Sequence, residues 1–223
     1  MDLDLAAFDF ADARARMVDS QIRPNRVNDP RILAAMRHLP RERFLPPALA
    51  SLAYSDEDIP LPGGRFMLEP MVLARLIQLV SLAGGARVLV VGAGTGYGAA
   101  VLAACGARVT ALESDPALRE LAAPALMAEA PGVELVAGSL ASGWPAGAPY
   151  DAILIEGAVA EVPAALPAQL RQDGRLVAVR RIEGQVGQAI LAEPTPLGLR
   201  ARPMFDCAAP SIPELLPRRG FVF

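Results

Sequence analysis

The sequence contains no lysine, one histidine and two cysteines, and each scarcity excludes a kind of chemistry. All 21 basic side chains are arginine, so Schiff-base or lysine-nucleophile catalysis is excluded. A single histidine, His38, argues against a zinc site and against a serine–histidine–aspartate triad. Cys105 and Cys207 are too few for a disulfide framework. We therefore expect no metal site and no disulfide scaffold.

Long apolar runs and strong net charge are also missing. The longest apolar runs are about ten residues, well short of the ~20 that a membrane span needs. The acidic start, Met1-Asp2-Leu3-Asp4-Leu5, lacks the basic residues of a secretory signal. A formal net charge of −3 argues against a nucleic-acid binder, which needs a basic face. We expect a cytoplasmic protein without membrane or nucleic-acid partners.

What the chain does have is a large apolar fraction, with 53% hydrophobic residues among 223, which is enough for one large core. Up to residue 86 the pattern predicts helices over Leu5–Ser20, from Pro30 to before Pro40, and after Pro70. We expect residues 1–83 to be a helical segment packed on the core, and residues 84–223 to form one compact nucleotide-binding unit.

From residue 87 onward, short apolar strands alternate with helices. The predicted strands cover residues 87–91, 108–112, 133–137, 151–155 and 175–181, and the predicted helices cover 97–105, 116–130 and 162–172. This alternation indicates an α/β fold with a mostly parallel sheet covered by helices on both faces. Near the end, residues 199–205 and 220–223 are candidate antiparallel edge strands.

A glycine-rich turn follows the first of these strands and reads Gly92-Ala93-Gly94-Thr95-Gly96-Tyr97-Gly98. Glycine lets the backbone turn sharply and approach a ligand closely. The next strand ends at Glu113, which lies 21 residues after Gly92, and a carboxylate there can accept both hydroxyls of an adenosine ribose. The sequence therefore predicts a nucleotide-type cofactor at the carboxyl ends of the strands.

Two cofactors fit this turn. Residues 94–99 match the dinucleotide fingerprint G-x-G-x-x-A, which would hold a nicotinamide or flavin cofactor. Because the strand ends at Val91, however, the turn begins at Gly92 and its spacing is Gly-x-Gly-x-Gly, which is similar to an S-adenosylmethionine loop. We favour S-adenosylmethionine, and a glycine turn without a ligand is the third reading.

Further segments give the chain a specific resemblance. They read Met17-Val18-Asp19-Ser20-Gln21-Ile22-Arg23-Pro24, Asp29-Pro30-Arg31-Ile32-Leu33-Ala34-Ala35-Met36, Pro40-Arg41-Glu42-Arg43-Phe44-Leu45-Pro46, Ala53-Tyr54-Ser55-Asp56 and Ile59-Pro60-Leu61-Pro62. With the glycine turn, the chain over roughly residues 14–180 resembles the protein-L-isoaspartate (D-aspartate) O-methyltransferase family. That resemblance implies a Rossmann-like class I S-adenosylmethionine methyltransferase fold with an N-terminal helical extension.

The resemblance also assigns site residues, with departures from the family pattern. The expected cofactor-binding residues are Gly92, Ala93, Gly94, Gly96, Tyr97, Glu113, Ser114, Ser139 and Leu140. Before Pro70, the family carries a segment resembling Gly-Gln-Thr-Ile-Ser-Gln-Pro, whose serine is its assigned active-site residue. Here Phe66 stands at the threonine position and Leu68 at the serine position, beside Arg65, which could pair with an anionic substrate. Ser139 replaces an aspartate that binds the adenine amino group, and Glu156 stands in a loop that the family fills with smaller residues.

The resemblance implies carboxyl methylation of L-isoaspartyl or D-aspartyl residues in damaged protein. Since Phe66 and Leu68 replace hydroxyl residues, two alternatives stay open. One is a methyltransferase of the same fold with another acceptor, such as a small molecule, and the other is a non-catalytic module that binds S-adenosylmethionine.

The ribose assignment can be tested directly. Replacing Glu113 with alanine removes the carboxylate that is predicted to accept the ribose hydroxyls, so Glu113→Ala should weaken S-adenosylmethionine binding in calorimetric titration. Unchanged affinity would show that Glu113 does not hold the ribose.

Overall fold

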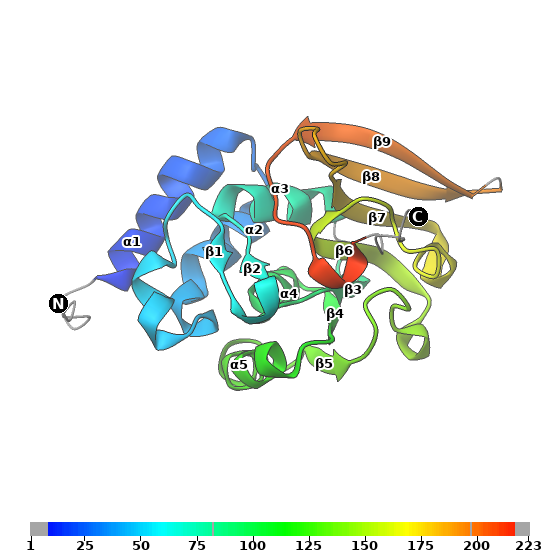
Figure 1. Ribbon diagram of the computed structural model, residues 1–223. Coiled ribbons are helices and arrows are strands. Elements are labelled where there is room, and N and C mark those ends of the chain that lie inside the picture. Colours follow the sequence, from blue (N-terminus) through cyan, green and yellow to red (C-terminus); the bar gives the residue numbers. More distant parts are fainter. Residues whose placement is uncertain (1–8, 82, 197, 217–223) are drawn as a thin grey trace, which may run out of the picture.

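A computed structural model describes residues 9–81, 83–196 and 198–216, and these residues form one large sheet beside an N-terminal helical segment (Figure 1). The strand order is β5-β4-β3-β6-β7-β8-β9. The strands are β3 (Arg87–Val91), β4 (Arg108–Glu113), β5 (Glu134–Ala137), β6 (Tyr150–Val159), β7 (Leu170–Arg180), β8 (Gln188–Thr195) and β9 (Gly198–Asp206). The pairs from β5 to β7 are parallel, and β8 and β9 are antiparallel to their neighbours.

Four of the five described α-helices begin at a proline or just after a capping aspartate. The five helices are α1 (Phe10–Met17), α2 (Pro30–His38), α3 (Pro70–Val80), α4 (Tyr97–Ala104) and α5 (Pro116–Glu129). The carboxylate of Asp115 accepts the N–H of Ala117 at 2.8 Å, and Asp29 caps α2 in the same way. A proline at the first helical position costs nothing, because its missing N–H would have no partner in the helix. A small antiparallel pair, β1 (Ile59–Pro60) with β2 (Phe66–Met67), lies between α2 and α3.

The α-helices cover one face of the sheet. The main core joins residues of α1 to α5 to alternate strand residues such as Val88, Val90 and Leu154. The other alternate residues, such as Leu89 and Ile153, face a second core that is closed by 3₁₀ turns and loops around Leu166 and Ile212. Among the described residues, these turns and loops stand in place of the α-helices predicted for this face. The described part of the chain contains no helix long and apolar enough to cross a membrane.

The predicted helix over Val162–Gln172 is wrong. Residues 160–166 form turns, Pro167–Gln169 is a 3₁₀ turn, and β7 begins at Leu170. Pro163 and Pro167 explain the difference, since each removes a backbone donor and crowds the preceding helical turn. The apolar spacing that indicated a helix instead places Val162 and Leu166 against the second core.

Other predictions were confirmed or incomplete. Strand β3 has the predicted bounds, and β9 is the predicted antiparallel edge strand. Strand β8 was not predicted. The start of the first predicted helix at Leu5 and the predicted strand at residues 220–223 lie outside the described residues. The division at residues 83 and 84 stays a prediction.

The packing of the central strands makes a quantitative prediction. Leu154 lies in β6 with no exposed surface, so Leu154→Ala should lower the free energy of unfolding by about 2–5 kcal/mol. Met127 is 77% exposed, and Met127→Ala should change the free energy of unfolding by less than about 0.5 kcal/mol. Urea denaturation of both variants measures the difference, and equal losses would contradict this account of the core.

Candidate functional site

The glycine turn between β3 and α4 is held against the end of β4. The N–H groups of Gly92 and Ala93 donate to the carbonyl of Leu112 at 2.9 and 3.1 Å. Gly96, with φ of 91°, precedes the first turn of α4, and a Cβ on it would come within 2.9 Å of Leu126. Only glycine fits this position without strain, so the sequence requirement at residue 96 is set by backbone conformation and packing.

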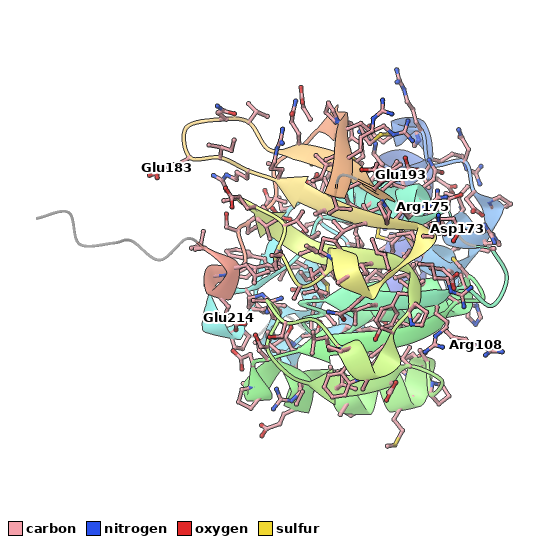
Figure 2. The ribbon with its side chains drawn as sticks, turned by 90° about the vertical axis from the view of Figure 1, so that its right-hand side faces the viewer. Arg108, Asp173, Arg175, Glu183, Glu193 and Glu214 are labelled. Carbon is pink, nitrogen blue, oxygen red and sulfur yellow. The ribbon has the colours of Figure 1, made fainter. Side chains whose placement is uncertain are left out.

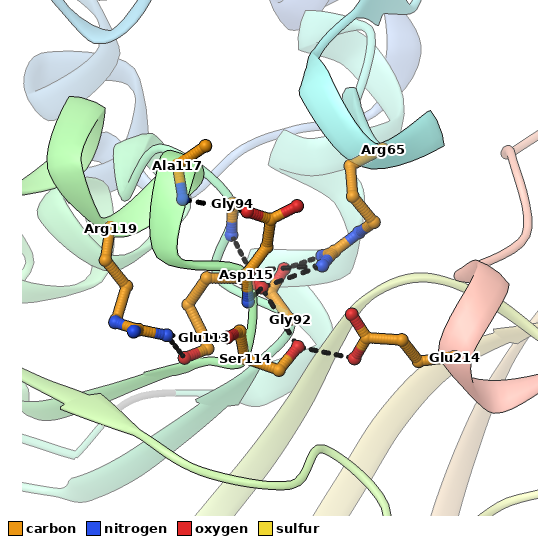
Figure 3. Close-up of polar contacts among 9 residues, drawn as sticks. All are labelled: Arg65, Gly92, Gly94, Glu113, Ser114, Asp115, Ala117, Arg119 and Glu214. Carbon is orange, nitrogen blue, oxygen red and sulfur yellow. Dashed lines mark hydrogen bonds and ion pairs between the residues drawn. The ribbon is translucent and has the colours of Figure 1, made fainter.

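Glu113 ends β4 beside this turn and has no exposed surface. Its carboxylate forms an ion pair with Arg65, whose Nη1 contacts both oxygens, at 3.0 Å from Oε1 and 3.1 Å from Oε2 (Figure 3). Arg65 is 4% exposed, and its Nη2 donates to the carbonyl of Gly92 at 2.8 Å. A single guanidinium thus joins the segment before α3 to both the glycine turn and the acid at the end of β4.

Further donors complete the shell around the Glu113 carboxylate. Oε2 accepts the N–H of Gly94 at 2.7 Å, and Oε1 accepts the N–H of Asp115 at 3.0 Å. The hydroxyl of Ser114 lies 3.3 Å from Oε1. Together with Arg65 these donors take all of the positions, about four, at which a carboxylate accepts hydrogen bonds.

A C-terminal 3₁₀ turn, Pro213–Leu215, lies over the same edge of the sheet. The backbone of Ile212 donates to Ala158 at 3.0 Å, next to the end of β6. The carboxylate of Glu214 accepts the hydroxyl of Ser114. Figure 1 shows this turn beside the segment that carries Arg65. No motif in the proline-rich ending of the sequence marks Ile212 or Glu214 as functional residues.

Three buried polar side chains gather under the first turn of α4. The guanidinium of Arg41 lies 4.8 Å from the ring centroid of Tyr97 and donates to the carbonyls of Ala53 and Leu68 at 2.7 and 2.6 Å. The carboxylate of Glu156 lies against Gly98, because a Cβ on that glycine would meet Oε2 at 2.3 Å. Among the described residues, Arg41 Nη1, the Tyr97 hydroxyl and Glu156 Oε2 have no hydrogen-bond partner.

Burial changes the ionisation of two of these groups. Loss of solvent raises the pKa of Glu156 to about 8, which the nearby charges of Arg41 and Arg65 only partly oppose. Burial also raises the pKa of Tyr97 to about 12. Near neutral pH, Glu156 is therefore mostly a neutral carboxylic acid that can donate a hydrogen bond.

The remaining predicted residues divide between the core and the surface. Leu68 is 1% exposed and packs in the main core, and Phe66 is half-buried in β2. Leu140 packs in the second core, whereas Ser139 is exposed. The structure thus brings Arg65, Glu113 and Ser114 together with the backbone of Gly92, Ala93, Gly94 and Gly96, and leaves the side chains of Leu68, Tyr97 and Leu140 in the interior.

A separate hollow of about 630 Å³ opens at the opposite end of the parallel strands. Arg108, Asp151 and Arg175 line it, and Asp151 accepts the N–H of Arg87 at 2.7 Å. Figure 2 shows Arg108 and Arg175 on one side of the molecule and Glu214 on the other. Asp151 therefore holds the start of β3 and lies away from the glycine turn. The described residues contain no cluster of histidine, cysteine and acidic side chains that could hold a metal ion.

The seven-stranded mixed sheet, with a glycine turn after its first parallel strand and an acid at the end of the next, is the fold of class I S-adenosylmethionine-dependent methyltransferases. The family model described as protein-L-isoaspartate(D-aspartate) O-methyltransferase matches residues 13–191. The chain belongs to this family of S-adenosylmethionine-dependent enzymes, which methylate isoaspartyl residues in damaged proteins.

Named relatives agree with the family assignment. The chain is 46% identical over 172 residues to protein-L-isoaspartate O-methyltransferase 1 of Rhodopseudomonas palustris, covering 77% of this chain and 70% of the relative. It is also 46% identical over 169 residues to a protein-L-isoaspartate O-methyltransferase of Methylorubrum extorquens, covering 76% and 74%.

Solved structures share the fold. A protein-L-isoaspartate O-methyltransferase matches with a TM-score of 0.78 and 26% identity, over 91% of this chain and 67% of the other. A Plasmodium falciparum protein solved with S-adenosyl-L-homocysteine matches with a TM-score of 0.75 over 90% of this chain and 98% of the other, and at 16% identity it shows the fold alone.

The buried acid predicts a pH dependence of stability. The pKa of Glu156 is raised from 4.5 to about 8 in the folded protein. The stability that the protonated carboxyl contributes is therefore complete below about pH 4.5 and is lost as pH rises through 8. Glu156→Gln cannot ionise. The free energy of unfolding of Glu156→Gln relative to wild type should therefore rise by up to about 4 kcal/mol between about pH 5 and pH 9, at about 1.36 kcal/mol per pKa unit.

Urea denaturation across this pH range measures the effect, and Glu57→Gln at an exposed position is the matched control. If the wild-type and Glu156→Gln profiles run parallel, the buried carboxyl does not titrate as described.

Proposed function

We propose that this protein transfers a methyl group from S-adenosylmethionine to the carboxyl group of L-isoaspartyl or D-aspartyl residues in damaged proteins or peptides. The observation that carries the proposal is the family match over residues 13–191. It coincides with a glycine turn and a buried acid at the carboxyl edge of the sheet. We place the protein in the cytoplasm, with residues 84–223 as the cofactor-binding unit and residues 1–83 packed on it.

S-adenosylmethionine fits the glycine turn, but its ribose would compete with the ion pair between Arg65 and Glu113. Gly92, Gly94 and Gly96 present backbone without side chains, and Glu113 is the acid for the ribose hydroxyls. We assign Ala93, Tyr97, Ser114, Ser139 and Leu140 to the surrounding cofactor contacts. The Glu113 carboxylate can accept hydrogen bonds from the ribose hydroxyls only when Arg65 no longer pairs with it.

Carboxyl methylation asks little of the protein in proton transfer. Bound S-adenosylmethionine supplies an electrophilic methyl group, and a carboxylate acceptor is already an anion, so no general base is needed. The residues that line the site act by holding the acceptor oxygen in line with the methyl carbon and sulfur, an effect that reaches about 7–11 kcal/mol in favourable cases. Loss of the family's hydroxyls at positions 66 and 68 therefore weakens orientation without removing a chemical step.

Glu156 is compatible with an anionic acceptor for a reason that the sequence does not reveal. An ionised acid close to the acceptor would repel its carboxylate, but burial keeps Glu156 mostly neutral near pH 7. A neutral carboxyl can donate a hydrogen bond to the acceptor. We propose Glu156 as an acceptor contact, beside Arg65, Phe66 and the backbone of Leu68.

A second candidate function is methyl transfer by the same scaffold to another acceptor, such as a small molecule. Phe66 favours it, because this half-buried apolar side chain stands where the family has a hydroxyl. A non-catalytic module that binds the cofactor is the third candidate.

A single assay separates these functions. Purified protein should form S-adenosylhomocysteine with a synthetic L-isoaspartyl peptide and none with its normal aspartyl twin. Circular dichroism and cofactor titration establish that the same preparation is folded and binds S-adenosylmethionine. If a folded, cofactor-binding preparation leaves the isoaspartyl peptide unmethylated, the proposed acceptor is wrong.

A further inference from the structure

The Arg65 guanidinium occupies the atoms that a cofactor ribose would use. Both oxygens of Glu113 bind Arg65, at 3.0 and 3.1 Å, and backbone N–H groups of Gly94 and Asp115 fill their remaining positions. The ribose hydroxyls can bind a carboxylate only as donors to the same lone pairs. Arg65 and the ribose therefore exclude one another at Glu113.

A second observation shows that Arg65 also fills space at the glycine turn. A Cβ on Gly92 would lie 2.8 Å from Arg65 Nη2 and 3.0 Å from Ile212 Cδ1. The guanidinium thus lies directly on the backbone that a nucleoside must approach, and its Nη2 donates to the Gly92 carbonyl. A ligand over this turn would therefore overlap the Arg65 guanidinium.

We propose that Arg65 is an internal competitor of the cofactor ribose and sets the affinity of this protein for S-adenosylmethionine. In the free protein Arg65 pairs with Glu113. When the cofactor binds, the ribose hydroxyls replace the guanidinium on the Glu113 carboxylate. The exchange concerns the cofactor alone, so it goes beyond the proposed function and holds for any methyl acceptor.

The segment that carries Arg65 is suited to this movement. Arg65 follows a 3₁₀ turn, Pro62–Gly64, in which Gly63 and Gly64 have φ of 68° and 69° and are exposed. Glycines lower the cost of changing backbone conformation. The adjoining pair of β1 and β2 joins only two residues of each strand, so little regular structure opposes a rearrangement that takes the side chain to solvent.

The exchange carries an energetic cost that substitution can remove. Arg65 and Glu113 are both buried, so separating them requires new partners for two charges. The ribose hydroxyls supply them for Glu113, and water supplies them for Arg65. Glutamine at position 65 has no charge and cannot form the ion pair with Glu113. In such a variant the Glu113 carboxylate has fewer hydrogen-bond donors in the ligand-free protein.

The test compares nucleoside binding to Arg65→Gln and wild type by isothermal titration calorimetry. S-adenosylhomocysteine and adenosine should bind Arg65→Gln about tenfold more tightly than wild type, as expected when a charge-assisted bond no longer has to be broken. 2′,3′-Dideoxyadenosine lacks both ribose hydroxyls and should gain much less. Arg43→Gln removes an exposed arginine that pairs with Glu129 and should leave all three affinities unchanged.

Thermal unfolding gives an independent readout. Arg65→Gln without ligand should melt below wild type, because Glu113 has lost its partner, and S-adenosylhomocysteine should raise its melting temperature more than it raises that of wild type. Arg65→Lys keeps the charge but lacks the second nitrogen that binds the Gly92 carbonyl. It should show an intermediate gain in affinity, which covers the case in which the glutamine variant folds poorly.

Weaker or unchanged adenosine binding by both variants would overturn the proposal and make Arg65 a supporting member of the cofactor site. Equal gains for adenosine and its dideoxy analogue would also overturn it, since Arg65 would then block the site without competing for Glu113. None of these titrations uses a methyl acceptor, so a failed isoaspartyl assay and a failed competition are separate results.

Discussion

The buried ion pair between Arg65 and Glu113 links two parts of the chain that are 48 residues apart. Through it, the segment before α3 is tied to the end of β4 and, through the Gly92 carbonyl, to the glycine turn. A buried ion pair whose partners have other hydrogen bonds is costly to break by removing one partner, because the remaining charge is left in a low-dielectric environment. This contact, together with the hydrogen bonds of Arg41 to Ala53 and Leu68, holds the segment before α3 over the glycine turn.

The other buried ionisable side chains, Arg41 and Glu156, lie at the same edge of the sheet. Arg41 supports the backbone of Leu68, and Glu156 lies beneath the first turn of α4. Arg41 and Arg65 both lower the pKa of Glu156, and Glu113 raises it, but burial dominates. The edge therefore combines a satisfied ion pair with a neutral acid that has an unpartnered oxygen, a combination suited to receiving a polar ligand.

The parts of this structure that could be predicted from sequence are those set by local pattern. The glycine turn, the acid at the end of β4 and the bounds of β3 follow from short-range spacing and apolar runs. The false helix over Val162–Gln172 shows the limit of that reasoning, because its apolar spacing was satisfied by loops packed on the sheet while Pro163 and Pro167 prevented a helix. The partner of Arg65 could not be predicted, since the sequence gives no signal for which of many acids will meet a given arginine in three dimensions. For the same reason the C-terminal turn, whose Glu214 reaches Ser114, had no assignment.

A crystal structure of the protein with S-adenosylhomocysteine tests the central claim most directly, because it shows which donors the Glu113 carboxylate accepts when the ligand is bound. The account predicts ribose hydroxyls on Glu113, the adenosine over the glycine turn, and the Arg65 guanidinium moved away from both. A complex in which the Arg65–Glu113 pair is intact and the ribose is held by other residues would contradict it.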